Sequence, residues 1–293
     1  MPSMTTRHFL QTGATLLAGL LLAACGKQEP AAPSASAPAT GPAVSAPAPA
    51  PRVYVVGTDA AYAPFELQNE KGEIVGFDID VVKAIAQKAG FEVKFLNTPW
   101  EGIFNSVAQG DRDLLVSSIT ITPERQQTLD FSAPYFDAQQ LIAVKIDSKI
   151  AKFADLKKLK VGVQNGTTGD EVVAKLQGKD SPNIKRFEST PLALKELESG
   201  GVDAVVADNG VVINYVNNNP DSKFKTVNDS SFAPEHYGIA VKKGNAELLE
   251  KINKGLAEIQ TDGTYKQIYA KYFGATPEAA GSAAPAPAAA ASN

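Results

Sequence analysis

The amino-acid sequence predicts an α/β fold with largely parallel sheets, built as two similar lobes. Strand-like and helix-like apolar patterns alternate through the middle of the chain, which is typical of this architecture. In addition, residues 110–118 align without gaps on residues 200–208, although few positions are identical and a chance alignment is the alternative. Parallel sheets bind ligands at the carboxyl ends of their strands, where loops converge. Functional residues are therefore expected at strand ends.

The first half of the folded region contains the clearest elements. Residues 53–56 predict a strand, and residues 78–89 carry apolar side chains at helical spacing before a terminating glycine. Residues 91–95 alternate as a strand does, and apolar positions within 103–107 mark the next helix. The apolar run at 114–116 predicts a buried strand that ends in hydroxyl residues.

A helix start follows these hydroxyl residues. Thr122 is a suitable N-cap, and Pro123 suits the first helical position. Arg125 then lies in the first turn, where the helix macrodipole disfavours a cation by roughly 0.3–1 kcal/mol. An anion should offset that penalty. The two alternatives are a structural pair with Glu124 or Asp130, and a ligand carboxylate held together with the neighbouring hydroxyls.

The second half repeats the alternation. Residues 161–163 predict a strand, and Thr168 with Glu171 three positions later forms a capping-box pattern. The exposed N–H groups of this helix start either serve ordinary capping or form a small anion site. Asp208 ends an apolar run, where a buried carboxylate needs a cation. If the repeat is real, Ser118 and Asp208 face each other across a shared cleft.

The two ends of the chain do not belong to the folded part. Residues 1–24 have the form of a signal peptide, because their apolar run is too short to span a bilayer. The run ends in Leu-Ala-Ala-Cys, which resembles the bacterial lipobox and predicts lipidation of Cys25. The alternative is an unpaired core cysteine. Cys25 is the only cysteine, so we expect no disulfide in the exported domain.

Low-complexity sequence flanks the expected domain. Residues 25–51, which begin with the lipidated Cys25, predict a disordered Ala/Pro-rich tether, and residues 275–293 predict a disordered Ala-rich tail. The formal net charge of −4 is mildly negative and argues against a nucleic-acid partner.

Several ordered motifs together resemble the periplasmic polar amino acid-binding proteins of ABC importers, which form solute-binding protein family 3. The resemblance covers roughly residues 53–273, and its most specific segments are residues 57–66, 76–80, 117–125, 130–135, 162–168 and 262–265. It implies the two-lobe periplasmic binding protein fold of type II, with two hinge strands joining the lobes around a ligand cleft.

The resemblance also implies roles for nine residues. Arg125 would bind the α-carboxylate of a free amino acid with the help of Ser118, Thr120 and Thr168, and Asp208 would receive the α-ammonium group. The residues expected around the ligand side chain are Asp59, Tyr62, Trp100 and Ser117. One departure is Gly169, which stands where several relatives carry a larger polar residue, so the far wall of the pocket is expected to differ.

The same resemblance predicts the domain organisation. Lobe I would comprise residues 52–136 plus 237–274, and lobe II residues 141–228. The chain would cross near 137–140 and return near 228–236, with His236 a hinge or surface residue rather than a catalytic one.

The function implied is a lipid-anchored receptor outside the cytoplasm that captures a free amino acid and delivers it to membrane permease subunits. We expect a monomer without cofactor or metal, and transport energy from a separate ATPase, because no phosphate-binding loop motif is present. The rivals are a lyase or dehydratase on the same scaffold and a sensor ectodomain.

The expected ligand is a basic amino acid, arginine or lysine first, with glutamine as runner-up. By resemblance, Asp59 lies between the rings of Tyr62 and Trp100, where a carboxylate is costly unless a donor-rich group pairs with it. A guanidinium also gains cation–π contact, and an acidic ligand would place two carboxylates together. The alternative is that Asp59 pairs with an internal lysine or caps a turn.

Overall fold

The computed structural model describes residues 52–274. The predicted signal peptide, the lipidation at Cys25, the tether and the tail lie outside the described residues. Within the described part, no helix is both long and apolar enough to cross a membrane.

The first lobe is built on a five-stranded sheet with the order β5-β1-β6-β14-β7. β1 pairs in parallel with β5 and β6, whereas β14 pairs antiparallel with β6 and β7. The strands are β1 (Val53–Thr58), β5 (Glu92–Asn97), β6 (Leu114–Leu115), β7 (Leu129–Phe131) and β14 (Ala240–Lys242).

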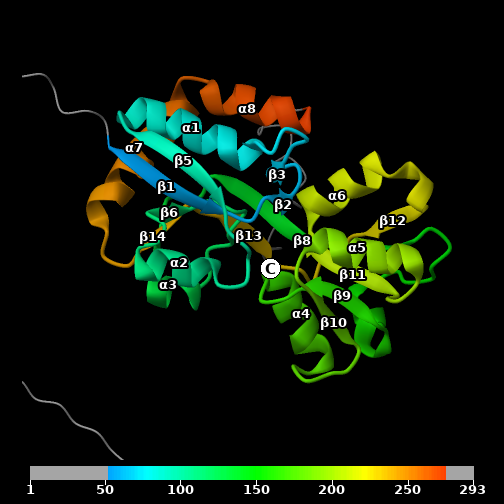
Figure 1. The fold of residues 1–293 in the computed structure, drawn as a ribbon. Helices are drawn as coiled ribbons and strands as arrows, with labels where there is room; N and C mark the ends of the chain where they lie inside the picture. The colour runs from blue at the N-terminus through cyan, green and yellow to red at the C-terminus, as the bar shows by residue number, and fades with distance from the viewer. Residues whose placement is uncertain (1–51, 275–293) are drawn as a thin grey trace, which may run out of the picture. The chain divides into compact units, whose positions relative to one another are not determined.

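Five helices belong to this lobe, and α1 packs against α7 and α8 (Figure 1). They are α1 (Phe77–Ala89), α2 (Ile103–Gln109), α3 (Arg125–Thr128), α7 (Ala246–Thr261) and α8 (Thr264–Phe273). The apolar stripe of α1 is buried at Ile79, Val82 and Ile85, and Gly90 ends the helix in the left-handed conformation. A small three-stranded sheet precedes α1 and consists of β2 (Ala61–Tyr62), β3 (Glu66–Gln68) and β4 (Ile74–Val75).

The second lobe is built on a sheet with the order β10-β9-β11-β8-β12. β9 pairs in parallel with β10 and β11, whereas β8 pairs antiparallel with β11 and β12. The strands are β8 (Phe136–Lys145), β9 (Val161–Gln164), β10 (Ile184–Phe187), β11 (Ala204–Asp208) and β12 (Phe224–Val227). The helices are α4 (Thr168–Gln177), α5 (Thr190–Ser199), α6 (Asn209–Asn218) and the 3₁₀ segments Phe153–Lys158 and Pro220–Ser222.

Two antiparallel strands carry the chain between the sheets. The start of β8 pairs with β13 (Pro234–Tyr237), with Phe136 opposite Tyr237 and Gln139 opposite Pro234, before β8 enters the second sheet. β13 overlaps the stretch where the sequence analysis expects the return crossing, and it leads into β14 of the first sheet. His236 lies on β13, exposed, and its Nδ1 is 2.7 Å from Asp137 Oδ1.

Two local predictions need correction. The helix expected from Thr122 is a single turn, α3, that begins at Arg125, although the Thr122 hydroxyl does accept a hydrogen bond from the Arg125 N–H at 3.2 Å. The cap of α4 is Thr167 rather than Thr168, since the Thr167 hydroxyl accepts from the Asp170 N–H. Two threonines precede two acidic residues here, so the sequence pattern fits either register.

Candidate functional site

One pocket is lined by all nine residues that the sequence analysis proposes. Its free cavity volume is about 20 Å³, and its lining residues come from both lobes. Three further residues, Glu66, Gln164 and Thr167, complete the lining of Asp59, Tyr62, Trp100, Ser117, Ser118, Thr120, Arg125, Thr168 and Asp208. Its ionisable lining therefore comprises three carboxyl groups, the phenol of Tyr62 and one guanidinium.

Asp208 occupies the carboxyl end of β11 and is 7% exposed. Its Oδ2 accepts hydrogen bonds from the hydroxyls of Tyr62 at 2.9 Å and Tyr237 at 2.5 Å, and its Oδ1 accepts from Gln140 Nε2 at 2.5 Å. Burial, followed by the charge of Glu235, raises the pKa of Asp208 to about 6 despite these bonds. The carboxylate has only uncharged donors, so a cation would stabilise it.

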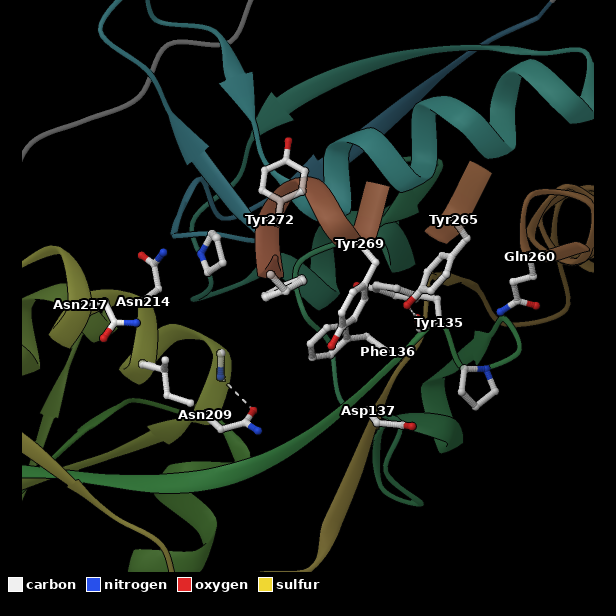
Figure 2. Close-up of a pocket in the computed structure, with 15 residues that line it drawn as sticks. Tyr135, Phe136, Asp137, Asn209, Asn214, Asn217, Gln260, Tyr265, Tyr269 and Tyr272 are labelled. Carbon is white, nitrogen blue, oxygen red and sulfur yellow. Dashed lines mark hydrogen bonds between the residues drawn. The ribbon is translucent and has the colours of Figure 1, made fainter. Parts of the chain in front are cut away.

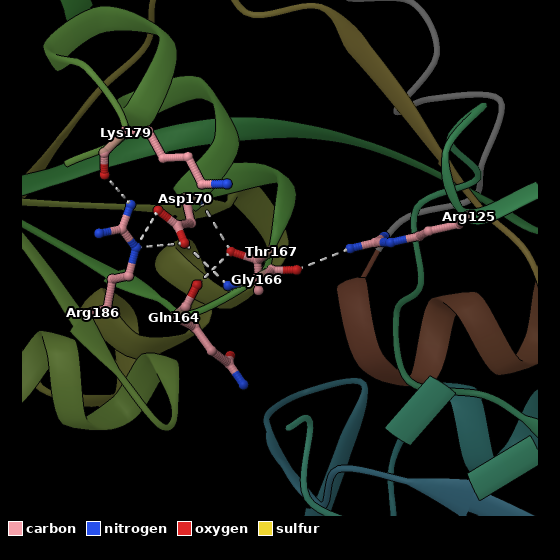
Figure 3. A network of polar contacts seen from close by, with 7 residues as sticks. All are labelled: Arg125, Gln164, Gly166, Thr167, Asp170, Lys179 and Arg186. Carbon is pink, nitrogen blue, oxygen red and sulfur yellow. Dashed lines mark hydrogen bonds and ion pairs between the residues drawn. The ribbon is translucent and has the colours of Figure 1, made fainter. Parts of the chain in front are cut away.

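Arg125 comes from the short helix α3 and is half-buried. Its guanidinium donates to the carbonyl of Thr120 at 2.9 Å and to the carbonyl of Gly166, in the other lobe, at 3.4 Å (Figure 3). It also lies over the rings of Trp100 and Phe104, 5.4 and 5.2 Å from their centroids. Burial lowers the pKa of Arg125, but an arginine stays charged in proteins.

Neither structural partner weighed for Arg125 forms an ion pair with it among the described residues. Asp130 instead pairs with Lys243 at 2.8 Å, and Glu124 is exposed. A helix of four residues also has little macrodipole, so the electrostatic argument from the first turn carries little weight. The guanidinium is held by carbonyls and rings, which leaves its charge without a carboxylate partner in this set of contacts.

The loop before α4 is fixed by its own hydrogen bonds (Figure 3). Asp170 accepts from the Gly166 N–H at 3.1 Å and from Arg186 Nε at 2.9 Å. The hydroxyl of Thr167 donates to the Gln164 carbonyl at 2.9 Å. Because Thr167 takes the capping role, the hydroxyl of Thr168 remains directed to other partners.

Asp59 directly follows β1 and lines the same pocket. Its carboxylate accepts from Gln164 Nε2 at 3.1 Å, across the lobes, and from the backbone N–H of Trp100. Burial raises the pKa of Asp59 more than these bonds lower it, and the charge of Glu188 adds to the rise. The expected alternative of a lysine partner finds no support in the described contacts, although the Trp100 N–H resembles a turn cap.

The hydroxyls of Thr120 and Thr168 converge from different lobes on one carboxylate oxygen. Both donate to Glu235 Oε2, at 2.6 and 2.8 Å, and Gln140 Nε2 donates to Glu235 Oε1 at 3.0 Å. Gln140 lies on β8 and Glu235 on β13, so the two connecting strands supply the hydrogen-bond partners of these pocket residues.

Gly169 does not line the pocket, which changes the expectation about its far wall. A Cβ at this position would lie 2.9 Å from Gln140 Oε1 and 3.0 Å from the Val206 carbonyl oxygen. The glycine therefore makes room for Gln140, whose amide reaches Asp208.

Sequence reasoning missed Glu66, Gln140, Gln164 and Glu235. Gln164 ends β9, so the rule that functional residues follow strand ends would have found it. Glu66 belongs to a motif used for the resemblance, but nothing local marks it as buried. Gln140 and Glu235 are distant in sequence and become neighbours only through the pairing of β8 with β13.

A larger depression of about 560 Å³ lies apart from these nine residues (Figure 2). Tyr265, Tyr269 and Tyr272 of α8 line one side, and Asn209, Asn214 and Asn217 of α6 line the other. Its only ionisable lining groups are Asp137 and the tyrosines. Among residues 52–274, no cluster of three or more His, Cys, Asp or Glu side chains could hold a metal ion.

Comparison with known proteins identifies the class. Residues 54–275 match the family model of bacterial extracellular solute-binding proteins, family 3. The "Probable histidine-binding protein" of Neisseria gonorrhoeae is 44% identical over 255 residues, which cover 87% of this chain and 91% of that protein. The "ABC transporter arginine-binding protein 1" of Escherichia coli K12 is 35% identical over 221 residues, covering 74% of this chain and 89% of that protein.

A solved structure agrees with this grouping. The arginine-, lysine-, histidine-binding protein of the thermophile Geobacillus stearothermophilus superposes with a TM-score of 0.75 at 45% identity, covering 78% of this chain and 97% of that chain. The fold is thus the two-lobe, type II fold of periplasmic amino acid-binding proteins. The chain belongs to family 3 of the bacterial extracellular solute-binding proteins.

Proposed function

We propose that this protein captures one free basic L-amino acid, arginine or lysine first, by closing its two lobes, and delivers it to the permease of an ABC importer. The known relatives that bind arginine, lysine or histidine support this proposal. In it, Arg125 binds the α-carboxylate and Asp208 the α-ammonium, while Asp59, with Tyr62, Trp100 and Ser117, receives the cationic side chain.

The observation that carries the proposal is the set of partners around the three charged groups. Asp59 accepts from an amide and a backbone N–H, and Asp208 from two phenols and an amide. Arg125 donates to carbonyls. A ligand with one carboxylate and two cationic groups would pair with all three charges, and buried charges need such partners.

The hydroxyls assigned to the ligand carboxylate have another partner in the structure. Thr120 and Thr168 donate to Glu235, so ligand binding requires at least one of them to exchange that bond for the ligand. The Ser118 hydroxyl likewise has Glu66 and Asp78 as acceptors, at 3.4 and 3.5 Å, whereas Arg125 donates to carbonyls, which is consistent with Arg125 as the principal contact for the α-carboxylate.

Histidine is a second candidate ligand, favoured by the 44% identity with the "Probable histidine-binding protein". Its imidazole can donate to Asp59, but it carries a full charge only below its pKa of about 6.5. Glutamine can donate to Asp59 without a cation–π contribution, and glutamate would add a carboxylate to a site already rich in them.

Calorimetric competition against arginine, lysine, histidine, glutamine and glutamate tests the ligand class. The proposal predicts that arginine or lysine binds most tightly and that glutamate does not compete. Glutamine binding at least tenfold tighter than both cations would contradict the basic assignment. Tight glutamate binding would contradict the whole assignment of charges.

We propose further that the protein is a monomer anchored to the membrane through lipidated Cys25, and that it releases its ligand unchanged. Fractionation of cells that express Cys25→Ala tests the anchor, with recovery in the soluble fraction as the expected result. A variant that is cleaved normally yet stays wholly with the membranes would contradict it. Recovery of bound amino acid without chemical change tests the absence of turnover.

A further inference from the structure

A pair of buried carboxyl groups adjoins the ligand pocket. Glu66, on β3, and Asp78, in the first turn of α1, are each 0% exposed, and the Ser118 hydroxyl lies between them, 3.4 Å from Glu66 Oε2 and 3.5 Å from Asp78 Oδ2. Glu66 also lines the pocket itself. No step of the proposed function uses either residue.

The groups that face this pair are neutral donors or acids. Asp78 Oδ2 accepts from the Ser118 N–H and from the Tyr135 hydroxyl, each at 2.7 Å. Glu66 Oε1 accepts from the Ser117 hydroxyl at 3.0 Å. The further titratable groups that influence the pair are Asp59, Tyr62 and Tyr265, and none of these is a cation.

Two carboxylates in such surroundings cannot both be ionised at low cost, because burial and like charge both oppose the second charge. Burial, with the charge of Asp78 next, raises the pKa of Glu66 well above its ordinary value. Burial also raises the pKa of Asp78, to about 6, whereas the hydrogen bonds from Tyr135 and Ser118 lower it. The donors thus favour charge on Asp78 and a proton on Glu66.

One atom of the pair shows where that proton belongs. Asp78 Oδ1 is buried and receives no conventional hydrogen bond from the other residues that the structure describes. A buried acceptor without a donor is costly. A carboxylic acid proton on the neighbouring Glu66 would be such a donor.

We propose that Glu66 stays protonated at neutral pH and donates a hydrogen bond to Asp78. The pair thereby sets the charge of the ligand pocket and determines which of its groups accept hydrogen bonds. Glu66 acts here as a positioning residue that determines specificity. The part of this inference that concerns the ligand rests on the proposed function, whereas the shared proton does not.

The first consequence concerns net charge. With Glu66 neutral, the charged lining residues are Asp59, Asp208 and Arg125, which sum to −1. A basic amino acid carries a net charge of about +1 at neutral pH, so it balances the charge of these three lining residues. An ionised Glu66 would leave an excess negative charge buried beside the ligand.

The second consequence concerns Ser117 and Ser118. The Ser117 hydroxyl accepts a hydrogen bond from the Asp59 N–H at 3.0 Å and donates one to Glu66. It can therefore only accept a hydrogen bond from the ligand. Ser118 has a positive φ of 47°, and its N–H bond to Asp78 stabilises this strained conformation. The pair therefore favours ligand groups that donate hydrogen bonds.

Amide substitutions in the full-length protein test the shared proton. In Glu66→Gln, the amide can donate to Asp78 while its carbonyl still accepts from Ser117. In Asp78→Asn, the carbonyl can keep the Ser118 and Tyr135 bonds while the amide donates to an ionised Glu66. In the double variant, two amide N–H groups face each other without an acceptor.

The expected result is a non-additive effect on thermal unfolding without ligand. Each single variant should melt close to wild type, and the double variant should lose roughly 4–8 °C beyond the sum of the singles. Glu70→Gln, at an exposed position, is the matched control. If both carboxylates were ionised in the wild type, either amide would relieve their repulsion. Each single variant would then melt well above wild type, and that result would overturn the proposal.

Two further measurements complete the test. The first uses the wild type and so does not depend on the folding of any variant, and the second concerns ligand binding. Infrared spectra of the wild type at about pH 7 should show a protonated carboxyl band, and its absence overturns the proposal. Weakening of arginine binding by tenfold or more in Glu66→Gln would show that Glu66 supplies a charge and would overturn a neutral Glu66. If no basic amino acid binds the wild type, the proposed function fails, but the melting cycle and the spectra still decide the proton.

Discussion

The two lobes have the same sheet and different chemistry. β5-β1-β6-β14-β7 in the first lobe corresponds strand for strand, in order and in direction, to β10-β9-β11-β8-β12 in the second. The repeated segment occupies equivalent places, since β6 and β11 are each preceded by a helix that ends in a left-handed glycine. The weak repeat in the sequence is therefore structural.

The two lobes differ in the residues that come after those two strands. After β6 the first lobe presents Ser117 and Ser118 and, further on, the guanidinium of Arg125, whereas β11 ends directly in the buried carboxylate of Asp208. The segment after this strand thus supplies a cation in the first lobe and an anion in the second. Under the proposed function, the shared scaffold fixes where the ligand lies, while these residues decide that the first lobe binds its α-carboxylate and the second its α-ammonium.

Removing the cation of the first lobe should have the largest effect. Arg125→Ala would leave a ligand carboxylate buried without its partner, which typically costs about 2–5 kcal/mol, or roughly 30- to 4,000-fold in affinity. Calorimetry with arginine measures the loss, and Arg52→Ala, at an exposed arginine of the same lobe, is the control. Binding within threefold of wild type would exclude Arg125 as the carboxylate contact.

The carboxylate of the second lobe should make binding depend on pH. The pKa of Asp208 is about 6 without ligand, and the ligand ammonium requires the ionised form, so bound ligand must displace a proton at lower pH. Affinity for arginine should fall about tenfold between pH 7 and pH 5. Asp208→Asn should bind at least tenfold more weakly at pH 7 and show a flatter profile.

The stability of the free protein should change in the opposite direction. A carboxyl group whose folded pKa is raised contributes stability that is present below its unfolded pKa of 3.8 and lost as pH rises through about 6. Wild type should therefore become less stable to urea over this range, and Asp208→Asn should reduce that slope. A variant with the same slope as wild type would show that Asp208 does not titrate there.

The smallest effect should be the same in both lobes. Gly110 and Gly200 have φ values of 88° and 86°, where a side chain costs roughly 1–2 kcal/mol. Gly110→Ala and Gly200→Ala should each lower the melting temperature by roughly 2–8 °C and leave ligand affinity unchanged. Gln109→Ala serves as control, and a large effect in only one lobe would mean that the two junctions are not equivalent.

Much of this architecture could be predicted because local signals decide it. The alternation of strand and helix patterns, the glycine stops and the strand-end positions all act over a few residues. Asp59 and Asp208 stand at strand ends, but the expectation that they share a pocket with Arg125 comes from the resemblance to the family, and their binding roles remain a proposal.

The rest depends on contacts between distant segments. Glu235 approaches Thr120 and Thr168 only because β13 pairs with β8, and no local pattern encodes that register. The shared proton of Glu66 and Asp78 depends on burial and on the lack of a donor at one oxygen, which no sequence motif expresses. The cap of α4 was misplaced by one residue because both registers satisfy the same motif.

The central claim is that Arg125 of the first lobe binds the α-carboxylate of a basic amino acid, while Asp208 of the second lobe binds its α-ammonium. Calorimetry of arginine and of agmatine, its analogue without the carboxylate, on wild type and Arg125→Ala tests it most directly. The account predicts that wild type prefers arginine by at least about 30-fold and that the variant binds both compounds almost equally, because both changes remove the same interaction. If the variant still preferred arginine as strongly as wild type does, Arg125 would not bind the carboxylate and the division of roles between the lobes would be wrong.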